Sequence, residues 1–313
     1  HQGPGLKIDF VIPGSTTDQT DIDLKSGDVL LKIDGKPVKN QMDLTTVLNG
    51  PSGEVKLTLK ARKDAKEKKE RDVTIVSTTY SMATSLLQKV RLKKNRDMVD
   101  KLSKGQLGYI NVSRMQWNEF IKFEEEIFAR GAGKEGLIID VRDNGGGFTA
   151  DHLLTVLTPP RHAVTIPRGG GAGYPQDRLV YATWTKPIIV LCNQNSFSNA
   201  EIFAHAIKEL GRGQVVGVTT AGGVISTGMT SIMDVGTLRL PFRGWFRLSD
   251  GADMELNGAV PDHIVWPEPG DWAAGKDRQI EKAVVELLKD VASKDEADQK
   301  APKLVPFSER AAK

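Results

Sequence analysis

"GLIIDVRDNGGGFTADHLL", residues 136–154, leads from an apolar run through three consecutive glycines into a helical pattern. A continuous apolar strand followed by a helix is typical of a parallel sheet that is covered on both faces. The same alternation recurs over residues 105–293, which we predict to form an α/β domain with a largely parallel sheet. The expected strands are 106–113, 136–142, 186–193, 214–220 and 237–242, and the expected helices are 117–131, 148–157, 199–210 and 276–291.

The first eighty residues follow a different pattern. "SGDVLLKIDGKPV", residues 26–38, brackets an apolar strand with turn signals, and the pair Asp34 and Gly35 favours a tight turn. We predict a β-rich unit over residues 3–80, with strands at 6–15, 29–33, 53–62 and 71–77 and a short helix at 41–49. Residues 81–104 are expected to be a linker with some helix, and residues 294–313 a charged, flexible tail.

Composition excludes several classes of function. Lys and Arg number 43 against 40 Asp and Glu, and the formal net charge of +3 is too balanced for a nucleic-acid binder. No apolar stretch approaches the roughly 18 residues that cross a bilayer, so we expect no membrane partner. Cys192 is the single cysteine, which rules out an intrachain disulfide and favours a reducing compartment. No H-E-x-x-H spacing is present, and we expect neither a metal nor a cofactor.

The three glycines Gly145, Gly146 and Gly147 close the turn after the strand at 136–142. Glycine lets bare backbone approach a ligand and aim N–H groups at it. The spacing fits neither a dinucleotide fingerprint nor a P-loop, because no lysine follows to reach a phosphate. The turn is therefore a candidate source of amide donors.

A second polar turn, "NQNSFSNAEIF", follows the apolar strand at 186–193. Either Ser196 or Ser198 is a reasonable helix cap, and Glu201 stands three residues after Ser198 as in a capping box. Beside a glycine turn, the same serine supplies a nucleophile near donors for the oxyanion of a tetrahedral intermediate. The capping and nucleophile interpretations both remain open at this point.

Two resemblances bear on this choice. "GPGLKIDFVIPGS" and "LKSGDVLLKIDGKPV" resemble the PDZ domains of bacterial and archaeal serine proteases. "GLIIDVRDNGGGF", "VLCNQNSFSNAEIFAHAIKELGRGQVVGVTTAGGVISTG" and "DMELNGAVPDHIVWP" resemble, in order, the carboxyl-terminal half of tricorn proteases, within the carboxy-terminal processing peptidases. The resemblance implies a ClpP/crotonase-like core and a serine endopeptidase that cleaves peptides or unfolded proteins.

The resemblance assigns roles to residues of this chain. It makes Ser198 the nucleophile and the N–H of Asn199 one of the two oxyanion donors. The other donor is a glycine N–H, for which Gly147 is the first choice and Gly146 the second. It also implies substrate contacts at "GG", Gly222 and Gly223. Gly223 stands where processing peptidases of the Ser-Lys type carry the lysine base, so a simple Ser-Lys dyad is excluded.

Tricorn-like enzymes use a histidine base instead, in a polar network that includes the glutamate matching Glu255. None of the five histidines matches that base, which the family places ahead of the PDZ domain. We expect the base to lie upstream of residue 1. His152 and His162 remain alternatives that could line the cleft, whereas His205 is expected to be packed.

Thr165 stands where tricorn proteases carry an acid that favours basic residues before the cut, so weaker selection for Lys and Arg is expected. The PDZ resemblance makes Gly3, Pro4, Gly5 and Leu6 a candidate carboxylate-binding loop, with a plain turn as the alternative. The implied partners are a peptide or unfolded protein substrate and further copies of the chain. The rival hypothesis is a non-catalytic, PDZ-containing peptide-binding scaffold.

Overall fold

A computed structural model describes residues 5–39, 41–48, 53–62, 69–160, 163–166, 168 and 182–300. The chain divides into two compact units, His1–Lys94 and Asn95–Lys313, which are described separately.

The first unit is an antiparallel sheet in the order β1-β2-β4-β5, with β3 paired to β2. Asp34 and Gly35 have positive φ angles of 46° and 75°, as the predicted tight turn between β2 and β3 requires. Its core includes Ile33, Val55 and the fully buried Leu59. The elements are β1 (Leu6–Lys7), β2 (Val29–Ile33), β3 (Lys36–Pro37), α1 (Thr45–Leu48), β4 (Glu54–Lys60) and β5 (Glu70–Val76).

The strand expected over residues 6–15 is much shorter in the structure. β1 covers only Leu6–Lys7, and Ile8 makes two further backbone hydrogen bonds of 2.8 Å, since it donates to the carbonyl of Asp28 and accepts the N–H of Gly27. The partner strand β2 begins at Val29, so the chain beyond Ile8 has no neighbouring strand to pair with. Alternation alone predicted a length that pairing does not support.

The expected linker is a single long helix, α2 (Tyr80–Ser103), and the division between the two units falls inside it. Thr79 begins it, because its Oγ1 accepts the N–H of Met82 at 3.2 Å. Only Asn95, Val99 and Ser103 are buried, which explains why the helical periodicity of the sequence is weak.

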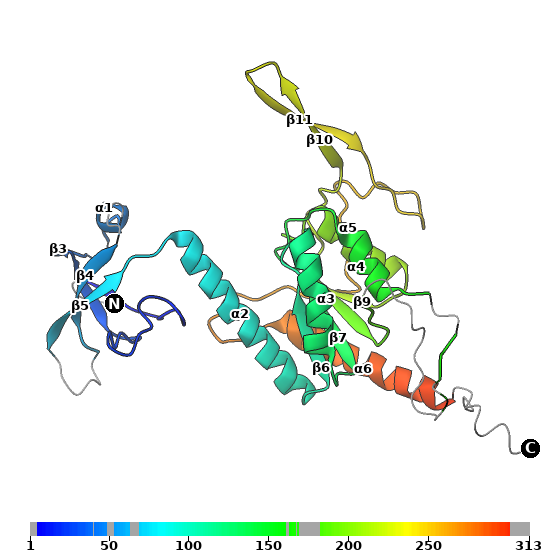
Figure 1. Ribbon diagram of the computed structural model, residues 1–313, viewed down its shortest axis with the longest axis horizontal. Helices are drawn as coiled ribbons and strands as arrows, with labels where there is room; N and C mark the ends of the chain where they lie inside the picture. Colours follow the sequence, from blue (N-terminus) through cyan, green and yellow to red (C-terminus); the bar gives the residue numbers. More distant parts are fainter. Residues whose placement is uncertain are drawn as a thin grey trace, which may run out of the picture. The chain divides into compact units, whose positions relative to one another are not determined.

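The second unit contains the predicted parallel sheet, in the order β12-β9-β8-β7-β6 (Figure 1). The fold prediction, an α/β core preceded by an antiparallel β-rich unit, is confirmed. The elements are β6 (Leu107–Asn111), α3 (Trp117–Gly131), β7 (Gly136–Asp140), α4 (Ala150–Leu157), β8 (Ile188–Cys192), α5 (Asn199–Glu209), β9 (Gln214–Gly217), β12 (His263–Ile264) and α6 (Arg278–Lys300).

The order of the strands explains how the sheet is covered. From β6 to β9 each strand lies beside the one before it, so right-handed crossovers place α3, α4 and α5 on one face. Alternate strand residues such as Leu137, Ile139 and Val190 form a core with those helices. On the other face α6 packs through residues such as Leu287, which lies against Gly136. The turns after β7 and β8 consequently meet at one edge of the sheet.

Two further differences concern residues 226–300. β10 (Ser226–Ile232), which the sequence did not predict, pairs antiparallel with β11 (Gly236–Arg243) in an exposed ribbon that extends away from the parallel sheet (Figure 1). α6 continues to Lys300, nine residues beyond its predicted end, so the start of the predicted flexible tail is helical. Residues 301–313 lie outside the described part of the chain.

Cys192 is fully buried at the end of β8, and burial raises the pKa of its thiol to about 12. The thiolate is the reactive form, so the thiol is inert at pH 8 in the folded protein. We expect Ellman's reagent to modify Cys192 only after unfolding in guanidinium chloride. The reaction is measured by absorbance at pH 8. Rapid modification of the native protein would contradict this burial.

Candidate active site

The turns after β7 and β8 are joined directly. Phe197 donates its backbone N–H to the carbonyl of Asn144 at 2.9 Å, and the side chain of Asn199 accepts the N–H of Ala150, the first residue of α4, at 2.7 Å. A Cβ atom on Gly146 would lie 2.7 Å from the Cβ of Ser198, so the glycine turn lies against the serine. The structure brings together the two turns that the sequence singled out.

Burial and backbone geometry separate the two serines. Ser196 is fully buried, donates its hydroxyl to the carbonyl of Val141 at 2.8 Å and accepts the N–H of Asn193 at 3.0 Å. Ser198 is only partly buried, with φ 55° and ψ −119°. An ordinary capping serine has extended angles, whereas strained residues of this kind cluster at functional sites. Ser198 is therefore the better candidate nucleophile.

Two backbone amides beside Ser198 are open to a ligand. Among the described residues, neither Gly147 nor Asn199 donates its N–H to a hydrogen bond. Asn199 is the first residue of α5, where an N–H has no partner within the helix. Gly146, the second choice from the sequence, gives its N–H to the side chain of Asn144 at 2.8 Å. These bonds favour Gly147 over Gly146 as the oxyanion donor.

Two buried residues at the site were missed or underrated from the sequence. Asn144 is fully buried and also donates to the carbonyl of Val112 at 2.8 Å, so it fixes the start of the glycine turn. Glu201 is fully buried and accepts the N–H of Ser198 at 2.8 Å, one half of the expected capping box. The position of Asn144 directly before three glycines was the available signal.

Gly222 and Gly223 lie in the loop after β9, and Glu255 lies in the loop between β11 and β12. Glu255 accepts the N–H groups of Val224 and Ile225 at 2.8 and 2.9 Å. Gly222 and Gly223 donate their N–H groups to Glu201, so a substrate contact at these glycines has to use other atoms. A Cβ on Gly223 would lie 2.2 Å from the ring of Phe197, which places this loop beside the nucleophile turn.

The three described histidines make other contacts. His152 packs edge-on against Trp117 and Phe120, with ring centroids 4.7 and 5.5 Å away. The Nε2 of His263 lies 2.7 Å from the side-chain oxygen of Gln214. His205 is partly buried, and this burial lowers the pKa of its ring. None of these described histidines hydrogen-bonds Ser198, and His1 and His162 lie outside the described residues.

The other predicted contacts lie away from these turns in sequence. Thr165 is exposed, and Leu6 begins β1. Gly5 has a φ of 85°, and a Cβ there would lie 2.4 Å from the carbonyl oxygen of Leu30. Gly3 and Pro4 lie outside the described residues. All five remain predicted substrate contacts.

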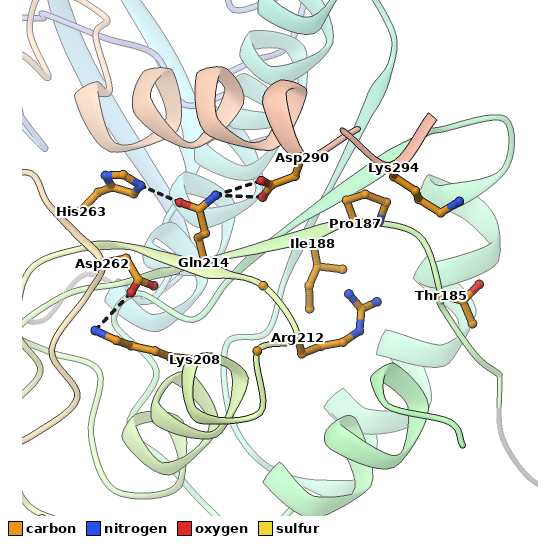
Figure 2. Close-up of a pocket in the computed structure, with 12 residues that line it drawn as sticks. Thr185, Pro187, Ile188, Lys208, Arg212, Gln214, Asp262, His263, Asp290 and Lys294 are labelled. Atoms are coloured by element: carbon orange, nitrogen blue, oxygen red, sulfur yellow. Dashed lines mark hydrogen bonds and ion pairs between the residues drawn. The ribbon is translucent and has the colours of Figure 1, made fainter. Parts of the chain in front are cut away.

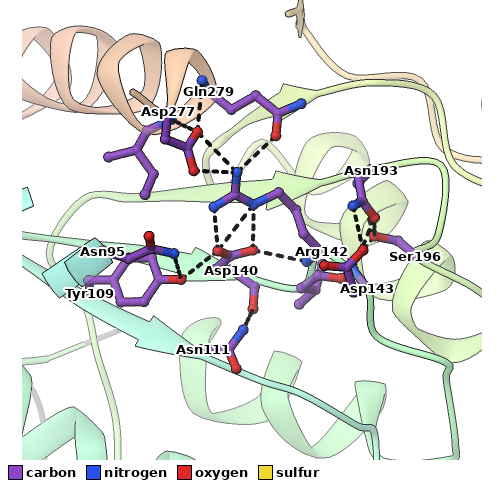
Figure 3. Close-up of polar contacts among 12 residues, drawn as sticks. Asn95, Tyr109, Asn111, Asp140, Arg142, Asp143, Asn193, Ser196, Asp277 and Gln279 are labelled. Atoms are coloured by element: carbon purple, nitrogen blue, oxygen red, sulfur yellow. Dashed lines mark hydrogen bonds and ion pairs between the residues drawn. The ribbon is translucent and has the colours of Figure 1, made fainter. Parts of the chain in front are cut away.

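A buried polar network lies at the end of β7, a few residues before the glycine turn in the sequence (Figure 3). Arg142 bonds Asp140 at 2.7 Å and Asp277 at 2.8 Å. Burial would lower the pKa of Arg142, but the two carboxylates outweigh it and hold the pKa well above its usual value. Burial and then Asp140 raise the pKa of Tyr109, whose hydroxyl donates to Asp140 at 2.5 Å. The network joins β7 to the start of α6.

A cavity of about 630 Å³ lies elsewhere, at the opposite edge of the sheet, where Ile188, Gln214 and His263 begin their strands (Figure 2). Its polar side chains are largely paired with one another, as in Lys208 with Asp262 at 3.2 Å. It is not part of the Ser198 site.

The described residues include no cluster of His, Cys, Asp and Glu that could hold a metal ion. Within the same residues, every helix is too short or too polar to cross a membrane.

Comparison with known proteins identifies the family of this chain. Residues 106–265 match peptidase family S41, and residues 1–60 match the PDZ domain. The tricorn protease of Thermoplasma acidophilum is 33% identical over 211 residues, which cover 66% of this chain and 19% of that protein. Tricorn protease homolog 1 of Streptomyces coelicolor is 29% identical over 317 residues, which cover 98% of this chain and 28% of the relative.

A solved structure gives the same result. The crystal structure of the tricorn protease superposes with a TM-score of 0.65 at 26% identity, over 87% of this chain and 26% of that chain. The chain thus spans less than a third of the length of these relatives. The family match covers more than half of the chain, including both turns of the candidate site. The chain belongs to peptidase family S41.

Proposed function

We propose that this chain is a serine endopeptidase of the tricorn or carboxy-terminal processing type, acting on peptides or unfolded proteins. The observation that carries the proposal is the position of Ser198, strained and partly exposed, beside the N–H groups of Gly147 and Asn199, which have no hydrogen-bond acceptor among the described residues. Ser198 attacks the scissile carbonyl, and the two amides bind the oxyanion that forms. The strain is consistent with a hydroxyl held for reaction.

The remaining parts of the proposal come from the family. Glu255 belongs to the polar surroundings of a histidine base, and the PDZ unit over residues 3–80 presents substrate to the α/β core over residues 105–293. Assembly into a homo-oligomer belongs to the same proposal. Light scattering after size-exclusion chromatography measures it.

A fluorophosphonate probe tests the proposal, because it forms a stable adduct with an activated serine. We expect tryptic mass spectrometry to place the adduct on Ser198 when the protein tested includes the histidine base, and to find none in Ser198→Ala. Ser231→Ala, which changes an exposed serine on β10, is the matched control and should keep the adduct. Cleavage of fluorescein-labelled casein should follow the same pattern.

The rival hypothesis gives a different result. A protein that includes the histidine base and binds peptides, yet forms no adduct on Ser198 and cleaves no casein, would be a non-catalytic scaffold. Such a result would contradict the proposed activity.

A further inference from the structure

Four consecutive backbone amides, residues 222–225, are bound by two carboxylates. Glu201 accepts the N–H groups of Gly222 and Gly223, the second at 2.9 Å. Glu255 accepts those of Val224 and Ile225 through a single oxygen, Oε2, at 2.8 and 2.9 Å. We call residues 222–225 the clamped segment. All four of its backbone N–H groups therefore donate to two acidic side chains.

Glu201 differs from Glu255 because it also holds the nucleophile. Its Oε1 accepts the N–H of Ser198 at 2.8 Å together with that of Gly223, and its Oε2 accepts Gly222 and the hydroxyl of Thr220. A carboxylate offers about four acceptor sites on two oxygens, so four donors use them fully. Glu201 is 0% exposed, and water cannot replace a lost bond easily.

The position of Thr220 extends this arrangement toward Glu255. Its Oγ1 accepts the N–H of Ala259 at 2.8 Å while it donates to Glu201. A Cβ on Gly258 would lie 2.7 Å from the carbonyl of Thr220, so the chain just after Glu255 packs tightly here. The nucleophile turn, the clamped segment and the loop carrying Glu255 therefore share one set of bonds.

We propose that Glu201 is a positioning residue that fixes the main chain of Ser198 and the clamped segment to one another. This inference rests on the proposed peptidase function. Ser198 has a backbone conformation that a serine adopts only when its surroundings impose it, and the bond from its N–H to Glu201 is one such restraint. Glu201 thereby keeps the serine hydroxyl aligned with the amides of Gly147 and Asn199.

Glu201→Gln tests the proposal with almost no change of volume. A glutamine turns one acceptor oxygen into an NH2 group, which then faces N–H or O–H donors in either amide orientation. We expect the rate of phosphonylation of Ser198 by the fluorophosphonate probe to fall by about tenfold to a hundredfold. With a peptide substrate, kcat should fall while KM changes little, because the lost contact aligns the nucleophile and does not bind substrate.

Glu126→Gln is the matched control. Glu126 is also a buried glutamate, 9% exposed, and accepts a bond of 2.6 Å from Arg96 at a distance from the turns. The control should lower thermal stability without changing the reactivity of Ser198. An equal loss of reactivity in both variants would show a general structural effect and would overturn the proposal.

Two further measurements keep the test independent of folding and of activity. Thr220→Val removes one of the four bonds to Glu201 and should slow phosphonylation by about twofold to tenfold, even if the glutamine variant fails to fold. In both Glu201→Gln and Thr220→Val, the rate of backbone hydrogen exchange should rise together in the peptides that contain Ser198 and the clamped segment. Failure of the wild-type protein, tested with its histidine base, to form an adduct contradicts the proposed function alone. Unchanged hydrogen exchange in both Glu201→Gln and Thr220→Val contradicts the positioning role.

Discussion

Replacing Gly147 with alanine is expected to lower kcat/KM for a peptide substrate by about a hundredfold or more. Gly147 has a φ of 149°, and a Cβ atom there would lie 1.9 Å from the carbonyl oxygen of Met115. That obstacle is backbone, so the turn itself has to move. Loss of one oxyanion donor typically costs a factor of about 10² to 10³ in rate.

The surrounding bonds make this displacement costly. Met115 donates its N–H to Gly146 at 3.0 Å and accepts that of Phe148 at 2.7 Å, on either side of Gly147. A shift that relieves the clash therefore breaks this bridge and displaces the N–H of Gly147, the proposed oxyanion donor. We expect the phosphonylation rate of Ser198 to fall in parallel, because the probe forms a tetrahedral adduct that uses the same donors.

Gly145→Ala is the matched control, since a Cβ on Gly145 meets nothing within 4 Å and its φ lies outside the left-handed region. Its activity should stay within about twofold of the wild type, as expected for exposed substitutions away from special backbone positions. A Gly147→Ala variant that keeps more than a tenth of the activity would show that this amide does not stabilise the oxyanion.

Local patterns predicted the core of the fold well. The helix at 117–131 has the bounds that the sequence predicts, because its apolar residues repeat at helical spacing and end at a glycine. The buried runs of β7 and β8 were also found, since strands covered on both faces are continuously apolar. The two polar turns were predicted as candidate sites because each directly follows one of these strands.

Long-range bonds were beyond such patterns. The capping-box spacing identifies Glu201 as a partner of Ser198, but its bonds to Gly222 and Gly223 join residues 21 and 22 positions away. No periodicity encodes that pairing, and the bond from the side chain of Asn144 to the carbonyl of Val112 likewise joins residues 32 positions apart. β10 was missed for the same reason. Its sequence has little apolar alternation, and its residues, such as Met229, pair with β11.

Replacing Arg142 with methionine is expected to lower the free energy of unfolding of the second unit by about 3–5 kcal/mol. The side chain of Arg142 is 13% exposed and bonds Asp140, Asp277 and the side chain of Gln279. Methionine fills much of the same space but leaves Asp140, 3% exposed, without its cation. Removing one partner of a buried pair costs about 3–5 kcal/mol, mainly because the other charge stays buried.

Urea unfolding followed by tryptophan fluorescence measures this change. All five tryptophans, at 117, 184, 245, 266 and 272, lie in the second unit, so their signal reports that unit. Lys294→Met is the matched control, because it breaks an exposed ion pair with Asp298 on α6 and should cost less than about 1 kcal/mol. Equal losses in the two variants would mean that the Arg142 network contributes no more than a surface pair. A larger loss of stability in Arg142→Met than in Lys294→Met would show that the support of the glycine turn depends on this buried cation. Asp140 ends β7, and the turn follows that strand.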